Sequence, residues 1–476
     1  MLQRAVQMVM FQDEGKPAGT RIEAVMAAIS ARIAARSLPT GARLPSVRAF
    51  AKTMQVSIST VVEAYERLAA EGMIRPRPGS GFYVAAPLVP LSLAQIEPRR
   101  EREIDPLWVS RQSLEASDAV LKPGCGWLPS SWMPEAALRR AIRGLGRADA
   151  AILTDYGSPL GLAGLRQLLS RRIGDLGLSV SPDQIMLTES GTHALDLFCR
   201  FFLEPGDCVL LDDPCYFNFN ALLRAHRVKL VSVPYLADGP DVEQFSRIVE
   251  EHRPRLYITN SGVHNPTGAS LSPVVAHRIL TIADRAGLII VEDDIFADFE
   301  NVPAARLSVF DGLNRVVQIG SFSKTLSASA RCGYIAARPD WIDGLTDLKI
   351  TTSFGGGRMA EELVLALLTD GGYRKYLEGL RLRLEAARNQ VTAKLAPLGI
   401  RPWLSPRAGM LLWCQLPDGV DSADLARHCV RENVVLAPGN VFSQAQTSGR
   451  FMRFNVAQMD DPRIYQALAR GLAALA

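Results

Sequence analysis

The chain has 476 residues, of which 48% are apolar and 21% are charged. This composition excludes a largely disordered protein, and the length predicts two or three folded domains. The formal net charge is only +4, but residues 16–86 alone carry ten lysines or arginines against four glutamates. The local excess of positive charge favours an anionic partner such as nucleic acid, although a solvated basic surface would give the same count.

The seven cysteines form no CxxC pair and no Cys/His spacing of a zinc site, so we expect reduced core thiols and no metal. No apolar run approaches the roughly 18 residues that a membrane span needs. Residues 1–14 also lack a signal-peptide cleavage pattern. The sequence therefore predicts a cytoplasmic protein without a membrane partner.

The first folded region is predicted at residues 15–86. Apolar residues recur at helical spacing from Thr20 to Arg36. Ser46 can cap a short helix through Met54, and another helix is predicted from about Ser57 to Ala70. Two short runs at 73–77 and 82–84 flank a Pro-Gly-Ser-Gly turn and indicate a hairpin. This order of elements predicts a winged helix-turn-helix.

Residues 87–117 are rich in proline and include the charged run 99–103, so we expect a linker there. The remaining region, 118–476, alternates helical patterns with short apolar runs. Such alternation predicts an α/β domain with a mainly parallel sheet covered by helices. The runs expected to form its strands are 185–187, 208–211, 256–258, 288–291 and 316–319.

The N-terminal region closely resembles the GntR family of bacterial regulators, in the segments 41–48 (GARLPSVR), 56–62 (VSISTVV) and 64–72 (AYERLAAEG). The resemblance implies that the chain binds a double-stranded DNA operator, with the second helix of the motif in the major groove. A purely structural role, capping of this helix, stays open for Ser57. By motif position, the implied DNA contacts are Arg43, Ser46, Arg48, Ser57, Ser59, Thr60, Arg75, Arg77 and Gly79.

The strongest chemical signal is the segment 321–326 (SFSKTL), which directly follows an apolar run and precedes 331–334 (RCGY). A lysine at the end of a strand, flanked by hydroxyl groups and glycine, can form a Schiff base with an aldehyde cofactor while its neighbours bind a phosphate. Lys324 is therefore the candidate catalytic residue.

Four further motifs support this interpretation. The segment 190–192 (SGT) opens an apolar helix whose N-terminus can hold a phosphate. Tyr216 follows a predicted strand and can stack on a flat ring, and Asn265 offers an amide to a phenolic oxygen. The acidic segment 292–294 (EDD) ends a buried apolar run, where a carboxylate is costly unless it pairs with a cation such as a protonated ring nitrogen.

Together these motifs resemble the aspartate-aminotransferase superfamily, fold type I of the enzymes that depend on pyridoxal 5′-phosphate. The resemblance implies that Arg453 clamps the α-carboxylate of a substrate or effector, and that Tyr156 reaches a phosphate across a dimer interface. Core packing for Tyr156 and Tyr216, and a surface ion pair for Arg453, remain alternatives. The implied cofactor-binding residues are Tyr156, Ser190, Gly191, Thr192, Tyr216, Asn265, Asp293, Ser321, Ser323, Lys324 and Arg331.

A GntR-type region joined to an aminotransferase-like domain is similar to the MocR subfamily of regulators. This resemblance implies a homodimer, often head-to-tail, whose DNA affinity depends on pyridoxal phosphate or on a small amino compound that forms an aldimine. The second hypothesis is an active aminotransferase that acts on an amino acid and a 2-oxo acid. A DNA-binding scaffold without cofactor is a third interpretation, and it would leave Lys324, Asp293 and Asn265 without a role.

Overall fold

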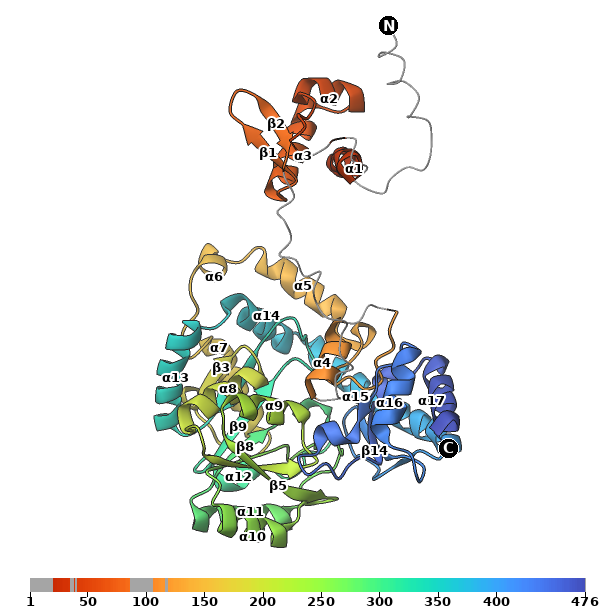
Figure 1. The fold of residues 1–476 in the computed structure, drawn as a ribbon. Coiled ribbons are helices and arrows are strands. Elements are labelled where there is room, and N and C mark those ends of the chain that lie inside the picture. Colours follow the sequence, from red (N-terminus) through yellow and green to blue (C-terminus); the bar gives the residue numbers. More distant parts are fainter. Residues whose placement is uncertain (1–19, 35–37, 39–40, 86–105, 116–118, 476) are drawn as a thin grey trace. The chain divides into compact units, whose positions relative to one another are not determined.

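The computed structural model describes residues 20–34, 38, 41–85, 106–115 and 119–475. The chain divides into two units, Met1–Glu101 and Arg102–Ala476, which are described separately here (Figure 1). No helix in the described part of the chain is long and apolar enough to span a membrane.

The smaller unit is a winged helix-turn-helix, as the sequence predicts. Its core joins α1 to α3 through Val25, Ile29, Tyr65 and Leu68, which are at most 1% exposed. Because these apolar residues recur every three or four positions, each helix buries one face. The two strands pair antiparallel. In chain order the elements are α1 (Arg21–Ala34), α2 (Val47–Met54), α3 (Ile58–Ala70), β1 (Ile74–Arg77) and β2 (Gly81–Val84).

The larger unit is built on a sheet with strand order β3-β10-β9-β8-β7-β4-β5-β6. The five strands from β9 to β5 in this order run parallel, whereas β10 and β6 pair antiparallel with their neighbours. A mainly parallel sheet is thus confirmed. Its strands are β3 (Ile185–Thr188), β4 (Cys208–Asp213), β5 (Lys229–Leu236), β6 (Gly239–Pro240), β7 (Leu256–Thr259), β8 (Ile289–Asp293), β9 (Val316–Ser321) and β10 (Gly333–Ala336).

Helices cover both faces of this sheet because successive strand residues point to opposite sides. Val209 and Leu211 pack with residues of α8 and α13, whereas Leu210 packs with residues of α10 and α11. Figure 1 shows α10, α11 and α12 along one side of the sheet. The helices from α5 onward are α5 (Glu135–Leu145), α6 (Ala150–Thr154), α7 (Ala163–Gly174), α8 (Gly191–Phe202), α9 (Phe217–Ala225), α10 (Val242–His252), α11 (Pro273–Ala286), α12 (Leu307–Asp311), α13 (Pro339–Ser353), α14 (Arg358–Thr369), α15 (Gly372–Leu395), α16 (Ser422–Arg431) and α17 (Pro462–Leu475).

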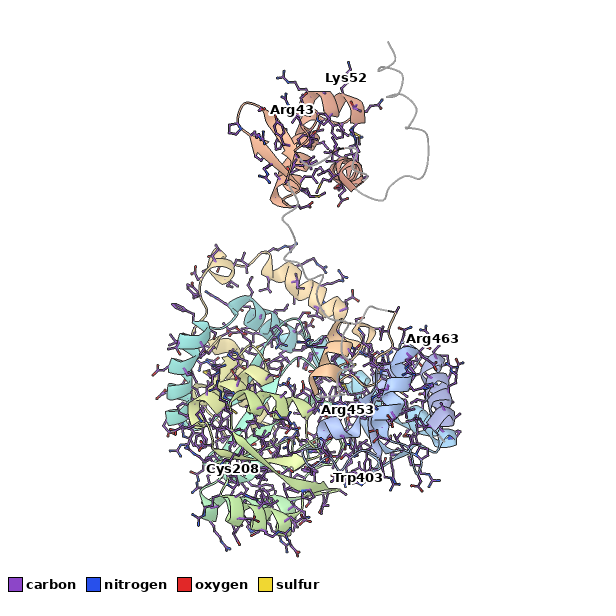
Figure 2. The ribbon with its side chains drawn as sticks, viewed as in Figure 1. Arg43, Lys52, Cys208, Trp403, Arg453 and Arg463 are labelled. Atoms are coloured by element: carbon purple, nitrogen blue, oxygen red, sulfur yellow. The ribbon has the colours of Figure 1, made fainter. Side chains whose placement is uncertain are left out.

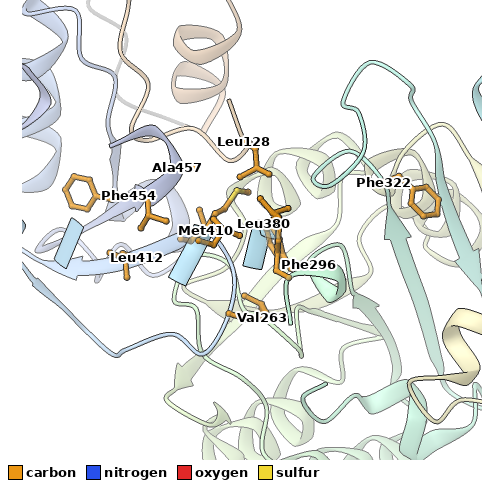
Figure 3. Packing of buried hydrophobic residues seen from close by; sticks show 14 of the residues in the cluster. Leu128, Val263, Phe296, Phe322, Leu380, Met410, Leu412, Phe454 and Ala457 are labelled. Carbon is orange, nitrogen blue, oxygen red and sulfur yellow. The ribbon is translucent and has the colours of Figure 1, made fainter. Parts of the chain in front are cut away.

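The C-terminal part of the larger unit adds an antiparallel sheet of order β11-β12-β14-β13, packed with α15, α16 and α17. A continuous apolar core joins this sheet to the residues around the larger one. Figure 3 shows part of this core, with Leu412 and Phe454 near Met410 and Leu380, and Phe296 and Val263 beside them. The strands are β11 (Arg401–Pro402), β12 (Leu411–Gln415), β13 (Ala437–Pro438) and β14 (Phe451–Asn455).

The structure differs from the sequence prediction inside the expected linker. Residues 86–105 and 116–118 lie outside the described residues, but Pro106–Glu115 form helix α4. Val109 of α4 is 2% exposed and packs with Phe217 of α9 and with Phe442. Proline at the first helical position is compatible with a helix, so Pro106 was not a sign of an extended chain. The end of the predicted linker therefore belongs to the folded core of the larger unit.

Candidate functional site

The predicted cofactor residues meet at one edge of the parallel sheet. Tyr216 follows β4, Asp293 ends β8 and Ser321 ends β9, so each stands at the carboxyl end of a parallel strand. β4 has β5 on one side and β7 on the other, so the chain direction across the sheet reverses between β4 and β7. Ligands of open α/β sheets bind at this kind of reversal, outside the carboxyl ends of the strands.

A cavity of about 490 Å³ opens at this edge. Every predicted cofactor residue except Tyr156 lines it. The sequence signal and the geometry therefore point to the same place, although the residues come from segments between 190 and 331.

One side of the cavity is suited to an anion. Ser190 caps α8, and its hydroxyl oxygen accepts a hydrogen bond from the backbone N–H of His193 at 3.0 Å. Ser321 Oγ and Ser323 Oγ lie 3.2 Å apart on the facing loop. The backbone at Ser190 lies so close to Gly333 that only glycine fits there, because a Cβ on residue 333 would lie 2.6 Å from the carbonyl carbon of Ser190. A helix N-terminus beside hydroxyl groups is a favourable phosphate site.

Lys324 and Asp293 dominate the electrostatics of the cavity. Burial, helped by the charge of Arg453, lowers the pKa of Lys324 to about 8. Burial raises the pKa of Asp293 to about 7, against the backbone N–H of Ile295, which donates to its Oδ1 at 3.1 Å. A lysine with such a pKa is partly neutral near neutral pH and can act as a nucleophile.

Tyr216 and Asn265 both line the cavity. Tyr216 is half-buried and packs on the ring of Phe219 at 5.4 Å between centroids, and burial raises its pKa. The ring of Tyr216 therefore packs in the core and also lines the cavity. Asn265 is buried, and its Oδ1 accepts a hydrogen bond from Nη1 of Arg453 at 2.9 Å.

Arg453 is 1% exposed and is hydrogen-bonded to Asn265, which lines the cavity (Arg453 is labelled in Figure 2). Its Nη2 donates to the carbonyl oxygen of Gly124 at 2.7 Å. Its Nε makes no hydrogen bond within the described residues, and burial lowers its pKa to about 10. The alternative of a surface ion pair is therefore wrong for this residue.

Tyr156 is not brought to the cavity of its own chain. Its side chain is 80% exposed and contacts the ring of Phe354 at 5.2 Å between centroids. The alternative of a core ring is therefore wrong as well. The adjoining backbone is firmly held, because buried Lys349 donates to the carbonyl oxygen of Pro159 at 2.7 Å.

In the smaller unit, the implied DNA contacts lie on α2, α3, the residues just before these helices and the hairpin. Ser46 and Ser57 cap α2 and α3 through hydrogen bonds from backbone N–H groups, so the capping role left open for Ser57 is present. Ser57 Oγ also lies 2.8 Å from Ser59 Oγ and 2.7 Å from Thr60 Oγ1. All the implied contacts except the partly exposed Thr60 are exposed: Arg43 (labelled in Figure 2), Ser46, Arg48, Ser57, Ser59, Arg75, Arg77 and Gly79.

Comparison with known proteins assigns both units. The family model for class I and II aminotransferases matches residues 128–470. The chain belongs to this family. Residues 21–84 match the bacterial regulatory proteins of the gntR family. The combination is consistent with MocR-type GntR regulators, and it makes the protein a transcription regulator with an aminotransferase-like domain. The helix-turn-helix family implies DNA binding, and the aminotransferase family implies dependence on pyridoxal phosphate.

Similar proteins agree with this assignment. The HTH-type transcriptional regulator YdcR of Escherichia coli is 27% identical over 440 residues, which cover 90% of this chain and 93% of YdcR. The regulator NorG of Staphylococcus aureus is 27% identical over 86% of this chain and 94% of its own. Among solved structures, α-aminoadipate aminotransferase LysN from Thermus thermophilus is 25% identical with a TM-score of 0.70, covering 76% of this chain and 95% of LysN.

The residues of the cavity fit pyridoxal phosphate. Asp293 places a buried carboxylate where a protonated ring nitrogen would stabilise it, and its raised pKa reports the cost of that burial. Asn260 Oδ1 is buried and accepts no hydrogen bond within the described residues. Lys324 would offer the aldehyde an amine with a lowered pKa, and the N-terminus of α8 would offer backbone N–H groups to the phosphate.

Sequence reasoning missed several cavity residues. Asn260 directly follows β7, so the rule that located Asp293 would have found it. Ser113, Lys122 and Trp127 carried no such signal, because they precede the recognised motifs and stand in or just after the predicted linker. The remaining lining residues outside the prediction are Leu114, Leu195, Asn218, Phe219, Ile295, Phe296 and Ala328.

Proposed function

We propose that this protein is a cytoplasmic, DNA-binding transcription regulator whose larger unit senses pyridoxal phosphate, an amino compound, or both. One observation carries the proposal. The side chains of Lys324, Asp293 and Asn265 line a single cavity together with the predicted phosphate-binding residues, in a chain that also has a GntR-type unit. A scaffold without cofactor would have no use for this arrangement, because a buried carboxylate and a buried amine both cost free energy.

Pyridoxal phosphate supplies an aldehyde that reacts with amines and a ring that accepts electrons. In this proposal, Lys324 would hold the cofactor through its side-chain nitrogen, and Asp293 would favour the protonated form of the ring nitrogen. Asn265 donates to the ring oxygen and Tyr216 stacks on the ring. The phosphate is held by Ser190, Gly191, Thr192, Ser321, Ser323 and Arg331, all of which line the cavity.

An effector with an amino group and a carboxylate would suit the two basic side chains Lys324 and Arg453. Arg453 reaches Asn265 with one arm of its guanidinium and keeps a buried Nε without a hydrogen-bond partner in the described part of the chain. A planar guanidinium binds a carboxylate through two parallel hydrogen bonds. We therefore assign Arg453 to the effector's carboxylate, next to the amine that would replace Lys324 on the cofactor.

The proposal includes a homodimer, in which Tyr156 contacts the cofactor phosphate of the partner subunit. Tyr156 contacts the exposed ring of Phe354, and Ile142 of α5 and Leu153 of α6 are also exposed. Met359 of α14 is exposed as well, and α14 packs against both α5 and α6. Apolar residues grouped in this way favour a protein interface, and a second copy is the occupant that would use Tyr156.

On the DNA side, α3 is proposed to enter the major groove of an operator. Ser57, Ser59 and Thr60 stand at its N-terminus, where free backbone N–H groups and hydroxyl groups can hold a phosphate. Arg75 and Arg77 are exposed on the hairpin, beside Gly79 with φ +70°. The absence of a side chain at Gly79 would let the tip of the wing approach DNA closely.

An experiment on the visible absorption spectrum tests the proposal. Purified protein is mixed with a panel of amino acids and amines, and binding to a duplex selected from a random DNA pool is followed in parallel at fixed salt. We expect one compound to shift the absorption of the bound cofactor and also to change the DNA affinity. A DNA affinity that no compound changes, while the spectrum does shift, would contradict the sensor.

Active transamination is the second candidate, and the pKa of Lys324 favours it. An amine with a pKa of about 8 can both accept and donate a proton near neutral pH, which a catalytic lysine must do. The same mixtures distinguish the two candidates. Accumulation of a 2-oxo acid over many turnovers, without an effect on DNA, would make the protein primarily an aminotransferase.

A further inference from the structure

The helix that ends the predicted linker reaches the cofactor cavity. α4 begins at Pro106, and residues 85–105 separate it from the last strand of the DNA-binding unit. Ser113 and Leu114, at the other end of α4, line the cavity with Lys122 and Trp127. We call α4 together with residues 119–127 the leading segment, because it is the first part of the larger unit along the chain.

Ser113 carries a buried hydroxyl group that the proposed function does not use. The residue is 2% exposed, and its Oγ makes no hydrogen bond within the described residues. A buried hydroxyl without a hydrogen bond costs free energy in the folded protein. Such a group is therefore unusual unless a ligand forms the missing hydrogen bond. Ser113 lines the cavity together with Asn218 of α9, the helix that α4 contacts, and it belongs to none of the sequence motifs assigned to the cofactor.

The leading segment also accepts hydrogen bonds from two groups of the proposed site, Arg453 for the effector and Lys324 for the cofactor. The carbonyl oxygen of Gly124 accepts a hydrogen bond from Arg453, and that of Gly126 accepts one from Nζ of Lys324 at 2.7 Å. A bound carboxylate competes for Arg453, and a bound cofactor competes for Lys324. Cofactor binding would therefore remove the hydrogen bond to Gly126, and an effector carboxylate would compete for the one to Gly124, so the hydrogen bonds that fix residues 124–126 depend on what the site holds.

Val109 gives α4 a second connection to the same guanidinium. It packs with Phe217 and Phe442 in one buried cluster. The guanidinium carbon of Arg453 lies 4.6 Å from the ring centre of Phe442 and 5.8 Å from that of Phe217. A shift of Arg453 toward a ligand thus changes the packing under α4.

We propose that Ser113 is a specificity-determining contact for an amino-acid effector whose side chain ends in a hydrogen-bonding group. Through Ser113 and the carbonyls of Gly124 and Gly126, the leading segment is the part of the larger unit that communicates effector binding to the linker. A ligand changes a conformational equilibrium only by binding two states unequally, and these contacts supply that difference. The inference rests on the proposed function, because it requires an effector in the cofactor cavity.

The test uses the full-length protein freed of cofactor and four reduced adducts of cofactor and amino acid. These probes are the N-(5′-phosphopyridoxyl) derivatives of L-asparagine and L-leucine, and of L-glutamine and L-methionine. Within each pair the side chains are similar in size, but only the amide has a strong hydrogen-bonding group for a hydroxyl, because a thioether sulfur is a weak acceptor and leucine has none. Dissociation constants are measured for the wild type, for Ser113→Ala and for Ser113→Thr, which keeps the hydroxyl.

We expect the wild type to prefer the amide in at least one pair, and Ser113→Ala to reduce this preference about tenfold, because one hydrogen bond contributes roughly that factor. Ser113→Thr, which keeps the hydroxyl, should retain the preference for the amide. Arg111→Ala is the matched control, since Arg111 is exposed on the same helix and does not line the cavity. A preference that Ser113→Ala leaves unchanged in both pairs would overturn the inference.

DNA affinity is then measured at saturating adduct. We expect the preferred adduct to change the DNA affinity of the wild type more than that of Ser113→Ala, and an equal change in both would refute communication through the leading segment. Failure of the proposed function has a different signature. If no adduct binds the wild type, the cofactor site itself is wrong, whereas tight binding that is insensitive to Ser113 removes only this inference.

Discussion

The pH dependence of cofactor attachment tests the account of Lys324 in detail. Only the neutral amine attacks an aldehyde, and burial lowers the pKa of Lys324 from the ordinary 10.5 to about 8. At pH 7.5, about a quarter of the protein then carries a neutral Lys324, compared with about one lysine in a thousand at the ordinary value. We therefore expect attachment about 200-fold faster than for an unperturbed lysine.

The assay is stopped-flow absorbance after mixing cofactor-free protein with pyridoxal phosphate between pH 6 and 10. Because the pKa is lowered, the rate should rise about tenfold per pH unit below pH 8 and level off above it. A rate that keeps rising through pH 10 would refute the reasoning. Lys324→Ala should abolish the attached chromophore, whereas Lys122→Ala, a lysine lining the same cavity, should retain it.

Three further results are expected. Ser57→Ala should cost the DNA-binding unit about 1 kcal/mol, measured by denaturant unfolding, because the α3 N-cap is lost; an unchanged midpoint would contradict the cap. Arg77→Ala should weaken DNA binding and lower the slope of log affinity against log salt by about one, and an unaltered slope would exclude a phosphate contact. Mixed dimers of Tyr156→Ala and Lys324→Ala chains should contain one intact site if Tyr156 serves the partner subunit, so cofactor affinity at that site should equal the wild type; failure to recover it would place Tyr156 elsewhere.

The secondary structure around the site could be predicted because it depends on local patterns. The apolar runs that became β3, β4, β7, β8 and β9 are continuous, as expected for strands buried on both faces. β10 was not predicted. It has only four residues, Gly333–Ala336, and its antiparallel place between β3 and β9 is set by pairing across the sheet.

The cofactor-lining residues could be predicted because each belongs to a short motif at a strand end. The contacts around them could not, since they join distant positions. Lys324 and Gly126 are 198 positions apart, and Arg453 and Gly124 are 329 apart. The position of Ser113 was hidden for another reason, because proline and charge in the stretch before it indicate a linker while tertiary packing on Phe217 stabilises a helix.

The central claim is that cofactor chemistry at Lys324 controls DNA binding. The most direct test is the dissociation constant for a selected DNA duplex at fixed salt, measured without cofactor, with pyridoxal phosphate, and with pyridoxal phosphate plus the compound that shifts its spectrum. The account predicts that the constant changes for the wild type and stays the same for Lys324→Ala. Equal constants in all conditions for the wild type, or an equal change in both proteins, would contradict it.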